Sequence, residues 1–454
     1  MSLLDHPQAQ ELLRQAQIAP TALAGWPQRL HGFLQRYLPC FFRQEHRDLV
    51  PVVLAGKLSN LERKTAEPIA RQAGRHRKPV QHFVGAGKWD DEAVLDELRQ
   101  HVAFEVGALD GVLILDGSGF PKSGAASCGV ERQWCGRLGK IDNCQVGVFL
   151  GYASSRGQAL VDRRLYLPRS WAADSDRRAQ GQVPEAVVFQ TKLDIGLDLI
   201  ARCRELPHGW VLGDDEFGRS AAFRGQLRRR GERYLLDVPS NTAVRDLAER
   251  GADGRKPAFQ RADAWAARQP AQRWRRLVVR DGAKGRVVVR ALVALVQTKD
   301  EDGRVGRRER LLVVRPVDHA GDTTYALTND LQQTAVTALV RIKQQRHAVE
   351  QLFQGAKGEV GLGHYAVRSW VGWHHHMTLS LLALWYLLLE RRHVGEKNPG
   401  ADGAAATPVA GGVPGARADA GATIRRDQRD RPPHRGGPHL PLAPHQQPLP
   451  AATR

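Results

Sequence analysis

The chain has 454 residues and is strongly basic, with 67 Lys and Arg residues against 48 Asp and Glu, a net charge of +19 and a pI near 10.2. This length allows two or three domains with a sizeable core and excludes a small scaffold held together by disulfides. The positive charge favours a polyanionic partner, because cations that neutralise phosphates release bound counterions. Nucleic acid is therefore the first candidate partner, although codon usage in a GC-rich genome also raises the arginine content.

Cysteine usage and hydropathy together predict a cytoplasmic protein. The cysteines are odd in number and include no Cys-x-x-Cys pair, which fits free thiols better than a disulfide framework or a zinc site. They are Cys40, Cys128, Cys135, Cys144 and Cys203. The start of the chain lacks the cationic segment and apolar run of a signal peptide. The longest apolar stretch, residues 379–389, is shorter than the about 20 residues that a bilayer crossing needs.

Residues 1–105 are expected to form a helical N-terminal domain. Apolar residues recur there at helical spacing, at residues 12–23, 30–38 and 93–102. Residues 62–74, a basic turn and a second short segment that ends near Phe83 resemble a helix-turn-helix, which would place cations at DNA phosphates. Helical hairpins with basic surfaces are common, so DNA binding by this domain is one of two interpretations.

From residue 112 the hydrophobic pattern changes to that of strands. The expected elements are three strands, a helix, a strand, a helix and a strand. In chain order they span residues 111–116, 144–152, 158–167, 185–205, 210–214, 220–230 and 234–238. This is the element order of a ribonuclease-H-like core, an α/β fold, whose first part is expected at residues 106–239.

The second half of the chain is expected to hold an insertion, the rest of the core and a tail. Residues 240–330 alternate strand patterns with turn signals, which predicts a β-rich insertion. The core then resumes at residues 331–394, with a long helix capped by Asn329 and Asp330 and an apolar second helix packed on the sheet. Residues 395–454 hold ten of the 25 prolines, which predicts a disordered tail. The abrupt change of composition suggests the hypothesis that this tail is translated from a shifted reading frame.

Two aspartates and one glutamate form the candidate catalytic group. Asp116 ends the first predicted strand and Asp214 ends the fourth, so the two meet at one edge if these strands are neighbours. The helix that carries Glu350 would add a third carboxylate. Three hard oxygen donors can hold two Mg²⁺ ions about 3.5 to 4 Å apart, which activate a water or a 3′-hydroxyl for attack on a phosphodiester. For Asp116 alone, a turn residue at a strand end is the competing interpretation.

Two cations accompany the glutamate on its predicted helix. Arg346, Glu350 and Lys357 fall at positions i, i+4 and i+11 and return to nearly the same side of the helix. A carboxylate between two cations suits metal-assisted chemistry on a phosphate backbone. A solvated helix with one i, i+4 ion pair is the competing interpretation.

Four motifs occur in a fixed order along the chain. They are Leu113-Ile-Leu-Asp116-Gly-Ser-Gly-Phe-Pro-Lys122, Gln133-Trp-Cys-Gly-Arg-Leu-Gly-Lys140 with Asn143-Cys-Gln145, Asp214-Asp-Glu-Phe-Gly218, and Arg346-x3-Glu350-x6-Lys357-Gly-Glu. Together they resemble a bacterial insertion-sequence transposase of the DDE superfamily, in the branch marked by a Tyr-Arg-Glu-Lys signature. The resemblance extends over about residues 50–390.

The resemblance implies roles for these residues. Asp116, Asp214 and Glu350 would bind two Mg²⁺ ions, which Mn²⁺ could replace, and Arg346 and Lys357 would grip phosphates at the transposon end. The resemblance also implies cleavage of the terminal inverted repeats, strand transfer into target DNA, and a homodimer on DNA. A nuclease without strand transfer and an inactive DNA-binding relic remain alternatives.

Three further features of the sequence bear on the site. Lys343 stands where the signature has its tyrosine, and it can contact a phosphate but cannot stack as a phenol does. Lys122 and Lys140 lie in a long predicted loop, residues 117–143, which could contact the DNA end or be merely solvated. His374-His-His376 cannot converge on one metal, since consecutive helical residues diverge by about 100°, so these side chains are expected at the helix surface and in packing.

Overall fold

The structure is a computed structural model that describes residue 11 and residues 25–250, 254–282, 285–317, 320–331 and 334–397. The predicted helix at residues 12–23 and residues 398–454 of the predicted tail lie outside these residues, whereas residues 395–397, also assigned to the tail, are helical. All described residues belong to one unit, Met1–Pro414. Within the described ranges, no helix combines the length and hydropathy that crossing a bilayer requires.

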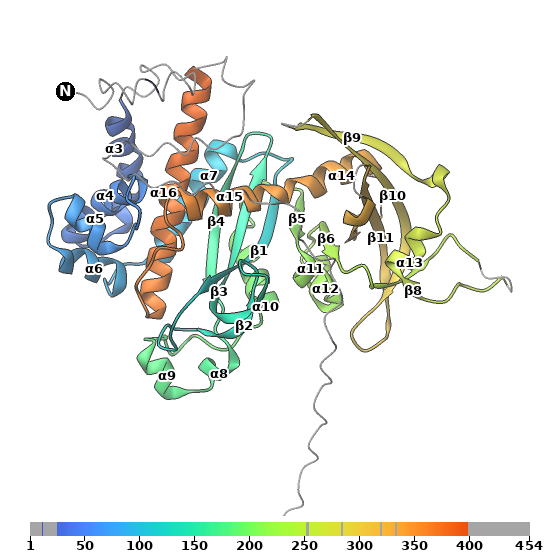
Figure 1. Cartoon of the computed structure of the whole chain (residues 1–454), viewed down its shortest axis with the longest axis horizontal. Helices are drawn as coiled ribbons and strands as arrows, with labels where there is room; N and C mark the ends of the chain where they lie inside the picture. The colour runs from blue at the N-terminus through green and yellow to red at the C-terminus, as the bar shows by residue number, and fades with distance from the viewer. Residues whose placement is uncertain are drawn as a thin grey trace, which may run out of the picture. The chain divides into compact units, whose positions relative to one another are not determined.

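Helices form the described part of the first 105 residues, as the apolar spacing predicts (Figure 1). They span Trp26–Tyr37 (α3), Gln44–Leu58 (α4), Ala66–Gln72 (α5), Arg77–Gly85 (α6) and Asp91–Val106 (α7), with a 3-10 turn at Leu38–Cys40 (η2). The side chain of Asp90 caps α7 by accepting hydrogen bonds from the amides of Glu92 and Ala93. The predicted basic hairpin is present as α5 and α6, joined through Gly74 at a φ of +63°.

Five strands build the centre of the sheet in the order β4-β3-β1-β5-β6. They span Val112–Pro121 (β1), Lys140–Ser154 (β3), Gly157–Leu165 (β4), Trp210–Gly213 (β5) and Tyr234–Val238 (β6). Strand β3 is antiparallel to β1 and β4, whereas β1, β5 and β6 are parallel to one another. This mixed sheet confirms the predicted α/β class and places the first predicted strand beside the fourth.

Helices connect these strands, as the sequence pattern predicts. They span Arg169–Ala172 (α8), Ser175–Gln180 (α9), Lys192–Arg202 (α10), Asp215–Gly218 (α11) and Ala221–Arg229 (α12). Helix α10 is shorter than the predicted helix at residues 185–205. It begins with a capping box, in which Thr191 and Asp194 satisfy each other's backbone amides.

The predicted long loop at residues 117–143 is largely wrong. Strand β1 continues to Pro121, which pairs with Cys144, and a short strand β2 (Glu131–Cys135) forms a hairpin with β3. The physical reason is that β3 is long enough to pair on one side with β1 and on the other, at its start, with β2. The run Gly117-Ser-Gly119 therefore lies in extended strand although its composition is typical of a turn.

The β-rich insertion is present, but it is not a separate piece. Its elements are β7 (Ala243–Asp246), β8 (Gln260–Arg261), α13 (Ala262–Ala267), η3 (Ala271–Arg273), β9 (Arg275–Gly282), β10 (Gly285–Lys299), β11 (Val305–Pro316), η4 (Ala320–Asp322) and β12 (Thr324–Thr328). Strand β12 pairs antiparallel with β6, so the described strands form one 12-stranded sheet. The insertion still has an apolar cluster of its own around the fully buried Trp265.

The predicted long helix through Lys357 is two helices, α14 (Val336–Gln345) and α15 (His347–Gly358), which meet at Arg346. Asp330 does not cap α14, whose N-cap residue is Ala335. Instead, the carboxylate of Asp330 accepts a hydrogen bond from Arg310, with an Nη1–Oδ2 distance of 3.3 Å. The interruption is a single residue, Arg346, whose backbone angles remain helical, at φ −56° and ψ −30°.

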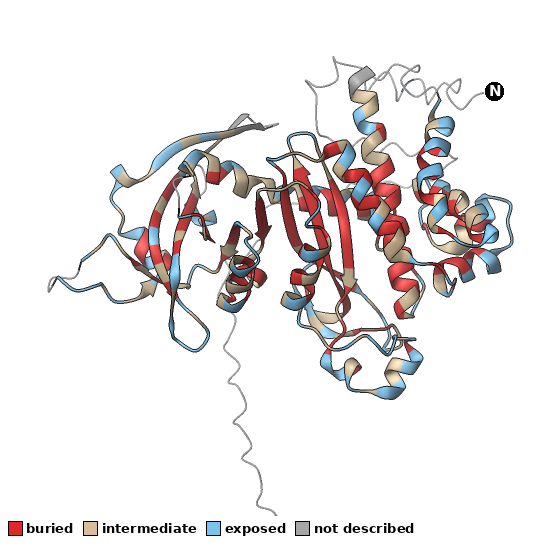
Figure 2. Ribbon diagram, turned by 180° about the vertical axis from the view of Figure 1, so that it is seen from behind, coloured by how far each residue is buried: buried red, intermediate tan, exposed pale blue. Residues whose placement is uncertain are grey.

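Helix α16 (Trp370–Lys397) packs on the sheet as predicted, and most of its length is buried (Figure 2). A side chain on Gly147 of β3 would collide with the Trp373 ring, since its Cβ would stand 2.8 Å away. The three histidines were expected at the helix surface and in packing; the packing is confirmed and the surface position is wrong. All are buried and bond to three separate groups: His374 to the carbonyl of Trp370, His375 to that of Trp89 and His376 to that of Leu362.

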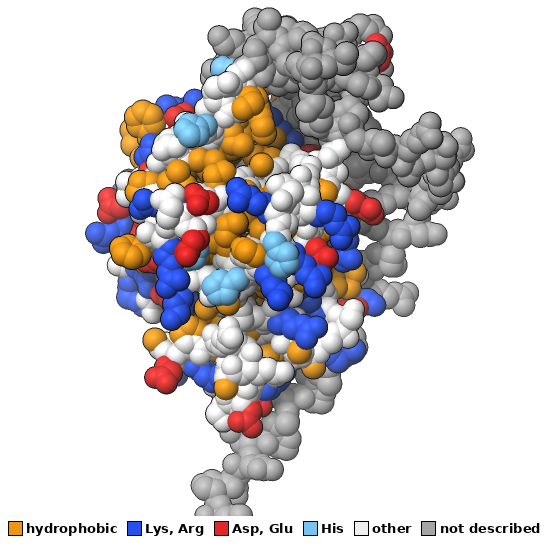
Figure 3. All heavy atoms as spheres, turned by 90° about the vertical axis from the view of Figure 1, so that its left-hand side faces the viewer, with side chains coloured by type: hydrophobic (Ala, Val, Ile, Leu, Met, Phe, Trp, Pro, Cys, Tyr) orange, Lys and Arg blue, Asp and Glu red, His pale blue; other side chains and the backbone are white. Residues whose placement is uncertain are grey.

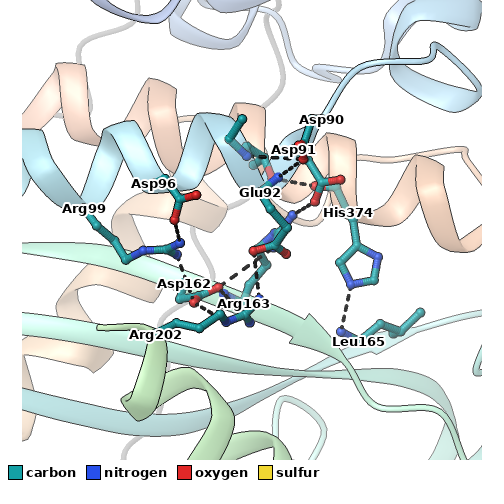
Figure 4. Close-up of polar contacts among 12 residues, drawn as sticks. Asp90, Asp91, Glu92, Asp96, Arg99, Asp162, Arg163, Leu165, Arg202 and His374 are labelled. Atoms are coloured by element: carbon teal, nitrogen blue, oxygen red, sulfur yellow. Dashed lines mark hydrogen bonds and ion pairs between the residues drawn. The ribbon is translucent and has the colours of Figure 1, made fainter. Parts of the chain in front are cut away.

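An ion network holds α7 and α10 against β4 (Figure 4). Asp162 on β4 is fully buried and pairs with Arg99 of α7 at 3.1 Å and with Arg202 of α10 at 3.2 Å. Its neighbour Arg163, also fully buried, binds Asp91 and Glu92 at the start of α7. Because the two central members carry opposite charge and lie side by side, each compensates part of the other's lost hydration.

Removing one central member should therefore be costly. We expect Asp162→Ala to lower the free energy of unfolding by about 3 kcal/mol or more, because Arg99 and Arg202 would lose a buried counterion. The exposed pair of Arg204 and Glu205 supplies the control, since Arg204→Ala should change stability by no more than about 0.5 kcal/mol. Urea denaturation of the three proteins measures both. An Asp162→Ala protein as stable as the parent would show that the network does not contribute to the free energy of unfolding.

Candidate active site

Asp116 lies on β1, and Asp214 directly follows β5, the neighbouring parallel strand. The β1–β5 pairing runs from Val112 opposite Trp210 to Leu115 opposite Gly213, and each aspartate is the next residue of its strand's path. Residues at matching positions of parallel strands project from the same face, about 4.8 Å apart along the sheet. The prediction that Asp116 ends its strand is wrong. Strand β1 continues along β3 after its pairing with β5 stops.

Helix α15 covers the face of the sheet to which Asp116 points. Asp116 pairs directly with Phe149 of β3, so both side chains project from that face. The Phe149 ring meets Phe353 of α15 edge to face, with centroids 5.2 Å apart. Glu350 is three residues before Phe353, on the adjoining turn of the same helix. The helix that carries Glu350 is thus packed on the face of the sheet to which Asp116 points.

The charges of these groups interact. Burial raises the pKa of Asp116 to about 7, with the nearby Asp214 as the second cause and Glu350 as a further one, while Arg346 opposes the shift. Burial also raises the pKa of Asp214 to about 6, followed by the charges of Glu216 and Asp215. Both aspartates keep part of their surface exposed, yet enough protein atoms surround the carboxylates to remove much of their hydration. An additional cation would relieve their repulsion.

Asp214 also has a structural role. It caps α11, because its Oδ1 accepts a hydrogen bond from the amide of Glu216 at 3.0 Å. The next residue, Asp215, turns outward to an ion pair with Arg219 at 2.7 Å. Glu216 approaches the site, since its Oε2 would lie 3.9 Å from a Cβ on Gly117, and its other oxygen pairs with Lys192 at 2.6 Å.

Arg346 stands among four carboxylates. Its Nε lies 3.3 Å from Asp237 and its Nη2 lies 3.4 Å from Glu350, and the charges of Asp116 and Asp214 also raise its pKa. Lys343 pairs with the same Asp237. Asp237 on β6 was missed by the sequence analysis. An acidic residue within the apolar run Tyr234-Leu-Leu-Asp-Val238 was the available indication, since such a residue needs a partner.

The structure brings two of the three predicted metal ligands together and leaves the third apart, so the metal site stays a prediction. Asp116 and Asp214 supply hard oxygen donors that repel each other, which suits a divalent cation. Glu350 does not face them, because it is half exposed and its oxygens contact Arg346 and His347 at 3.4 and 2.9 Å. Within the described residues, no three His, Cys, Asp or Glu side chains are grouped as a metal site. A rotation of the Glu350 side chain would be needed to complete the set.

The remaining predicted cations, Lys357, Lys122 and Lys140, differ in burial and in the groups that they contact. Burial lowers the pKa of Lys357, followed by the charge of Arg137, while Asp116 acts in the opposite sense. The Lys357 ammonium lies over the Phe353 ring of its own helix, 5.3 Å from the ring centroid. Lys122 packs over the Tyr365 ring at 3.5 Å, and burial lowers its pKa to about 8. Lys140 is exposed and pairs with Asp142 at 3.0 Å.

The comparisons with known proteins agree with this geometry. Residues 36–286, more than half of the chain, match the family model of the DDE superfamily endonucleases. The chain therefore belongs to the DDE superfamily endonuclease family. It is also 30% identical over 204 residues to a probable transposase for insertion sequence element IS701 from Microchaete diplosiphon. That alignment covers 42% of this chain and 49% of the relative, so the chain spans about half the length of that protein.

These findings confirm the predicted resemblance to insertion-sequence DDE transposases. The family match contains Asp116 and Asp214 and stops before Glu350. The roles of the three carboxylates and the Tyr-Arg-Glu-Lys branch thus remain predictions.

The repulsion between the paired aspartates predicts an unusual effect on stability. The ordinary pKa of Asp116 is 3.8 and its folded value is about 7, so the metal-free protein should lose stability as the pH rises between these values. Asp116→Asn removes this loss. We expect the variant to be more stable than the parent at pH 8, by about 1 kcal/mol or more, and the difference to shrink toward pH 5.

Thermal unfolding in the presence of a chelator measures this difference. Asp302→Asn, in the exposed turn between β10 and β11, is the control and should show no such pH dependence. Equal stability of the Asp116→Asn protein and the parent at pH 8 would mean that Asp116 is not destabilising in the folded state.

Proposed function

We propose that this protein is a DDE transposase that cuts the ends of an insertion sequence and joins them to target DNA in a Mg²⁺-dependent reaction. The observation that carries the proposal is the pair of repelling carboxylates, Asp116 and Asp214, on adjacent parallel strands beside Arg346 and Lys357. The family match and the transposase relative support the reaction class. The strand order β4-β3-β1-β5-β6 supports a ribonuclease-H-like core.

Asp116, Asp214 and Glu350 would hold the divalent ions. When bound, such ions activate the attacking water or 3′-hydroxyl and stabilise the leaving oxygen of the phosphodiester. The protein contributes by positioning, since β1 and β5 fix two carboxylates on one face and α15 carries the third above them. Glu350 would exchange its contacts with Arg346 and His347 for this site.

Arg346, Lys343 and Lys357 would bind phosphates of the DNA end. In this structure Asp237 pairs with Arg346 and Lys343, and in the complex a phosphate would take its place or share the guanidinium. Lys357, whose ammonium already loses hydration, would gain most from an anionic partner. Lys122 and Lys140 would add contacts from the extension of β1 and from the β2–β3 hairpin.

The proposed partner DNA comprises the terminal inverted repeats and the target, with two copies of the chain bound across the two ends. The helical N-terminal domain, residues 1–105, is the proposed first DNA contact. Its α5–α6 hairpin exposes Arg71, Arg75, Arg77 and Lys78, and Figure 3 shows Lys and Arg side chains interspersed with apolar ones on this side of the molecule. The proposed core then comprises residues 106–239 and 331–394, with the insertion at residues 240–330 and the tail at 395–454.

An arginine row on the insertion supports a polyanionic partner. Arg290 of β10 lies directly opposite Arg276 of β9 on one side and Arg315 of β11 on the other. Like charges at opposed positions destabilise a sheet. None of the three forms an ion pair with a carboxylate among the described residues, and Arg315 packs over the Trp274 ring at 4.5 Å. A phosphate backbone along this row would remove the repulsion.

The direct test is cleavage of DNA that bears the element's own ends. We expect the parent to cut and join such DNA with Mg²⁺, and Glu350→Ala to reduce cutting at least about 100-fold, since loss of groups that only support ligands already costs 10- to 100-fold. DNA affinity should remain, because a carboxylate does not bind phosphate. Glu359→Ala, one residue past the end of α15 and near Arg391, is the matched control and should cut normally.

The same assay separates the alternatives. Cutting without joining would identify a nuclease, and binding without cutting by the parent would identify a DNA-binding relic, which the lysine at position 343 makes worth testing.

The arginine row predicts a change in salt dependence. Replacing Arg276 and Arg290 together by alanine should reduce the slope of log affinity against log salt by up to about two, since each phosphate contact contributes about 0.9. Arg304→Ala is the control, because Arg304 lies in the same insertion but is already paired with Asp302. Fluorescence anisotropy of labelled DNA across a salt series measures the slopes. A double variant with the parent's slope would exclude the row from the DNA interface.

A further inference from the structure

The β2–β3 hairpin exposes apolar side chains next to the candidate active site. Trp134 of β2 and Ile141 of β3 are directly opposed and therefore project side by side, and each is 59% exposed. Leu138, in the turn between them, is 42% exposed. A single exposed apolar residue needs no explanation, but a tryptophan backed by a second apolar residue at a hairpin end does.

The exposure of Trp134 is not a result of a loose hairpin. The opposite face of the hairpin is formed by a small buried cluster of Cys135, Cys144 and Val146. Gln133 donates a hydrogen bond to the carbonyl of Cys144 at 3.0 Å. On β3, the Asn143 side chain donates to the carbonyls of Lys122 and Gly124, at 2.7 and 3.1 Å. The hairpin is thus anchored through its buried face and through Asn143, while Trp134 and Ile141 have no cover among the described residues.

Cations surround the apolar face. Arg132 projects from the same face as Trp134, two residues away, and is exposed. Arg137 lies in the turn and Lys140 at its far side, and both are exposed. An apolar patch for a protein partner is usually depleted of lysine at its centre. Aromatic side chains among cations are instead typical of surfaces that stack on bases while they bind the backbone.

The hairpin is joined to the strand that carries Asp116. Cys135, next to Trp134, packs on Gly119 so tightly that a Cβ there would stand 2.8 Å from its Sγ. Gly119 follows Asp116 by three residues of extended strand, which is about 10 Å. The charges of Arg137 on this hairpin and of Asp116 both act on Lys357 of α15. A DNA strand whose phosphate reaches Asp116 therefore has its neighbouring nucleotides within reach of the hairpin.

We propose that Trp134, supported from behind by Ile141, stacks on an unpaired base of the DNA next to the phosphodiester held at Asp116, while Arg132 and Arg137 bind the adjoining phosphates. The proposal rests on the proposed function for the location of the DNA. A wedge of this kind would favour DNA whose end is already unpaired, because no stacking energy between bases has to be lost there.

Binding to two forms of one probe tests this. The probes are a duplex of the element's end and the same duplex with mispaired bases beside the expected cleavage position, both without divalent ions so that no cutting occurs. The parent should prefer the mispaired probe, and Trp134→Ala should lose about tenfold of its affinity for it, in line with the loss of one aromatic–base stack. Trp134→Phe should keep most of the preference, since a phenyl ring still stacks.

Controls separate the possible outcomes. Leu109→Ala removes an apolar side chain that is 90% exposed in the turn before β1, outside the N-terminal domain, and should leave both affinities unchanged. If Trp134→Ala binds both probes as the parent does, the proposal is wrong, even if the parent cuts the element's ends. If Trp134→Ala instead changes the sedimentation of the free protein and not its DNA binding, the hairpin contacts another protein copy and the proposal is equally wrong.

Failure of the proposed function has a different signature. It would appear as absence of cutting by the parent with Mg²⁺, whatever the affinity ratio of the two probes. The substitution itself should not disturb folding, because Trp134 is exposed, and equal melting temperatures of the variant and the parent check this.

Discussion

The parallel pairing of β1 with β5 is the constraint on which the rest of the structure depends. It sets Asp116 and Asp214 at matching positions, each directly after the paired residues of its strand, where their negative charges repel each other. The sheet fixes their backbones by hydrogen bonds along both strands, so the side chains cannot separate by more than a rotation. The surrounding elements then supply charge compensation, with Arg346 from the junction of α14 and α15 and Lys357 from the end of α15. The repulsion between the aspartates lowers the stability of the fold at this edge of the sheet. A functional role of the edge is consistent with the family to which the chain belongs.

Asp237 links this edge to the cation cluster. It lies on β6, the next parallel strand, and holds Lys343 and Arg346 in place without DNA. The two cations are thus ordered in advance, which reduces the side-chain entropy lost when a phosphate arrives. The same contact leaves Glu350 paired with Arg346 and turned from the aspartates. The state described here is one in which the cations are satisfied by protein carboxylates.

Local patterns in the sequence were enough to predict the fold class, most helices and the positions of Asp116 and Asp214. They sufficed because each aspartate directly follows an apolar run that pairs with the other. What failed depends on contacts between distant residues. Strand β2 is polar and follows a glycine-rich stretch, so nothing local distinguishes it from a loop. The break at Arg346 has no proline or glycine, and it coincides with ion pairs to a strand more than one hundred residues earlier.

The family match confirms the class of protein but not the roles of single residues. Glu350 illustrates the limit, since its place on a helix was predictable while its rotamer was not. Side-chain direction in an exposed first turn is decided by whichever cation is nearest. Here these are Arg346 and His347.

The union of β12 with β6 has a mechanical meaning for the whole molecule. A domain inserted through two flexible linkers can swing, but strands that share a ladder of backbone hydrogen bonds move together. Nucleic acid held on the outer strands would therefore sit at a constant offset from the paired aspartates. Such an arrangement would measure out a set length of duplex between the place that is gripped and the bond that is broken.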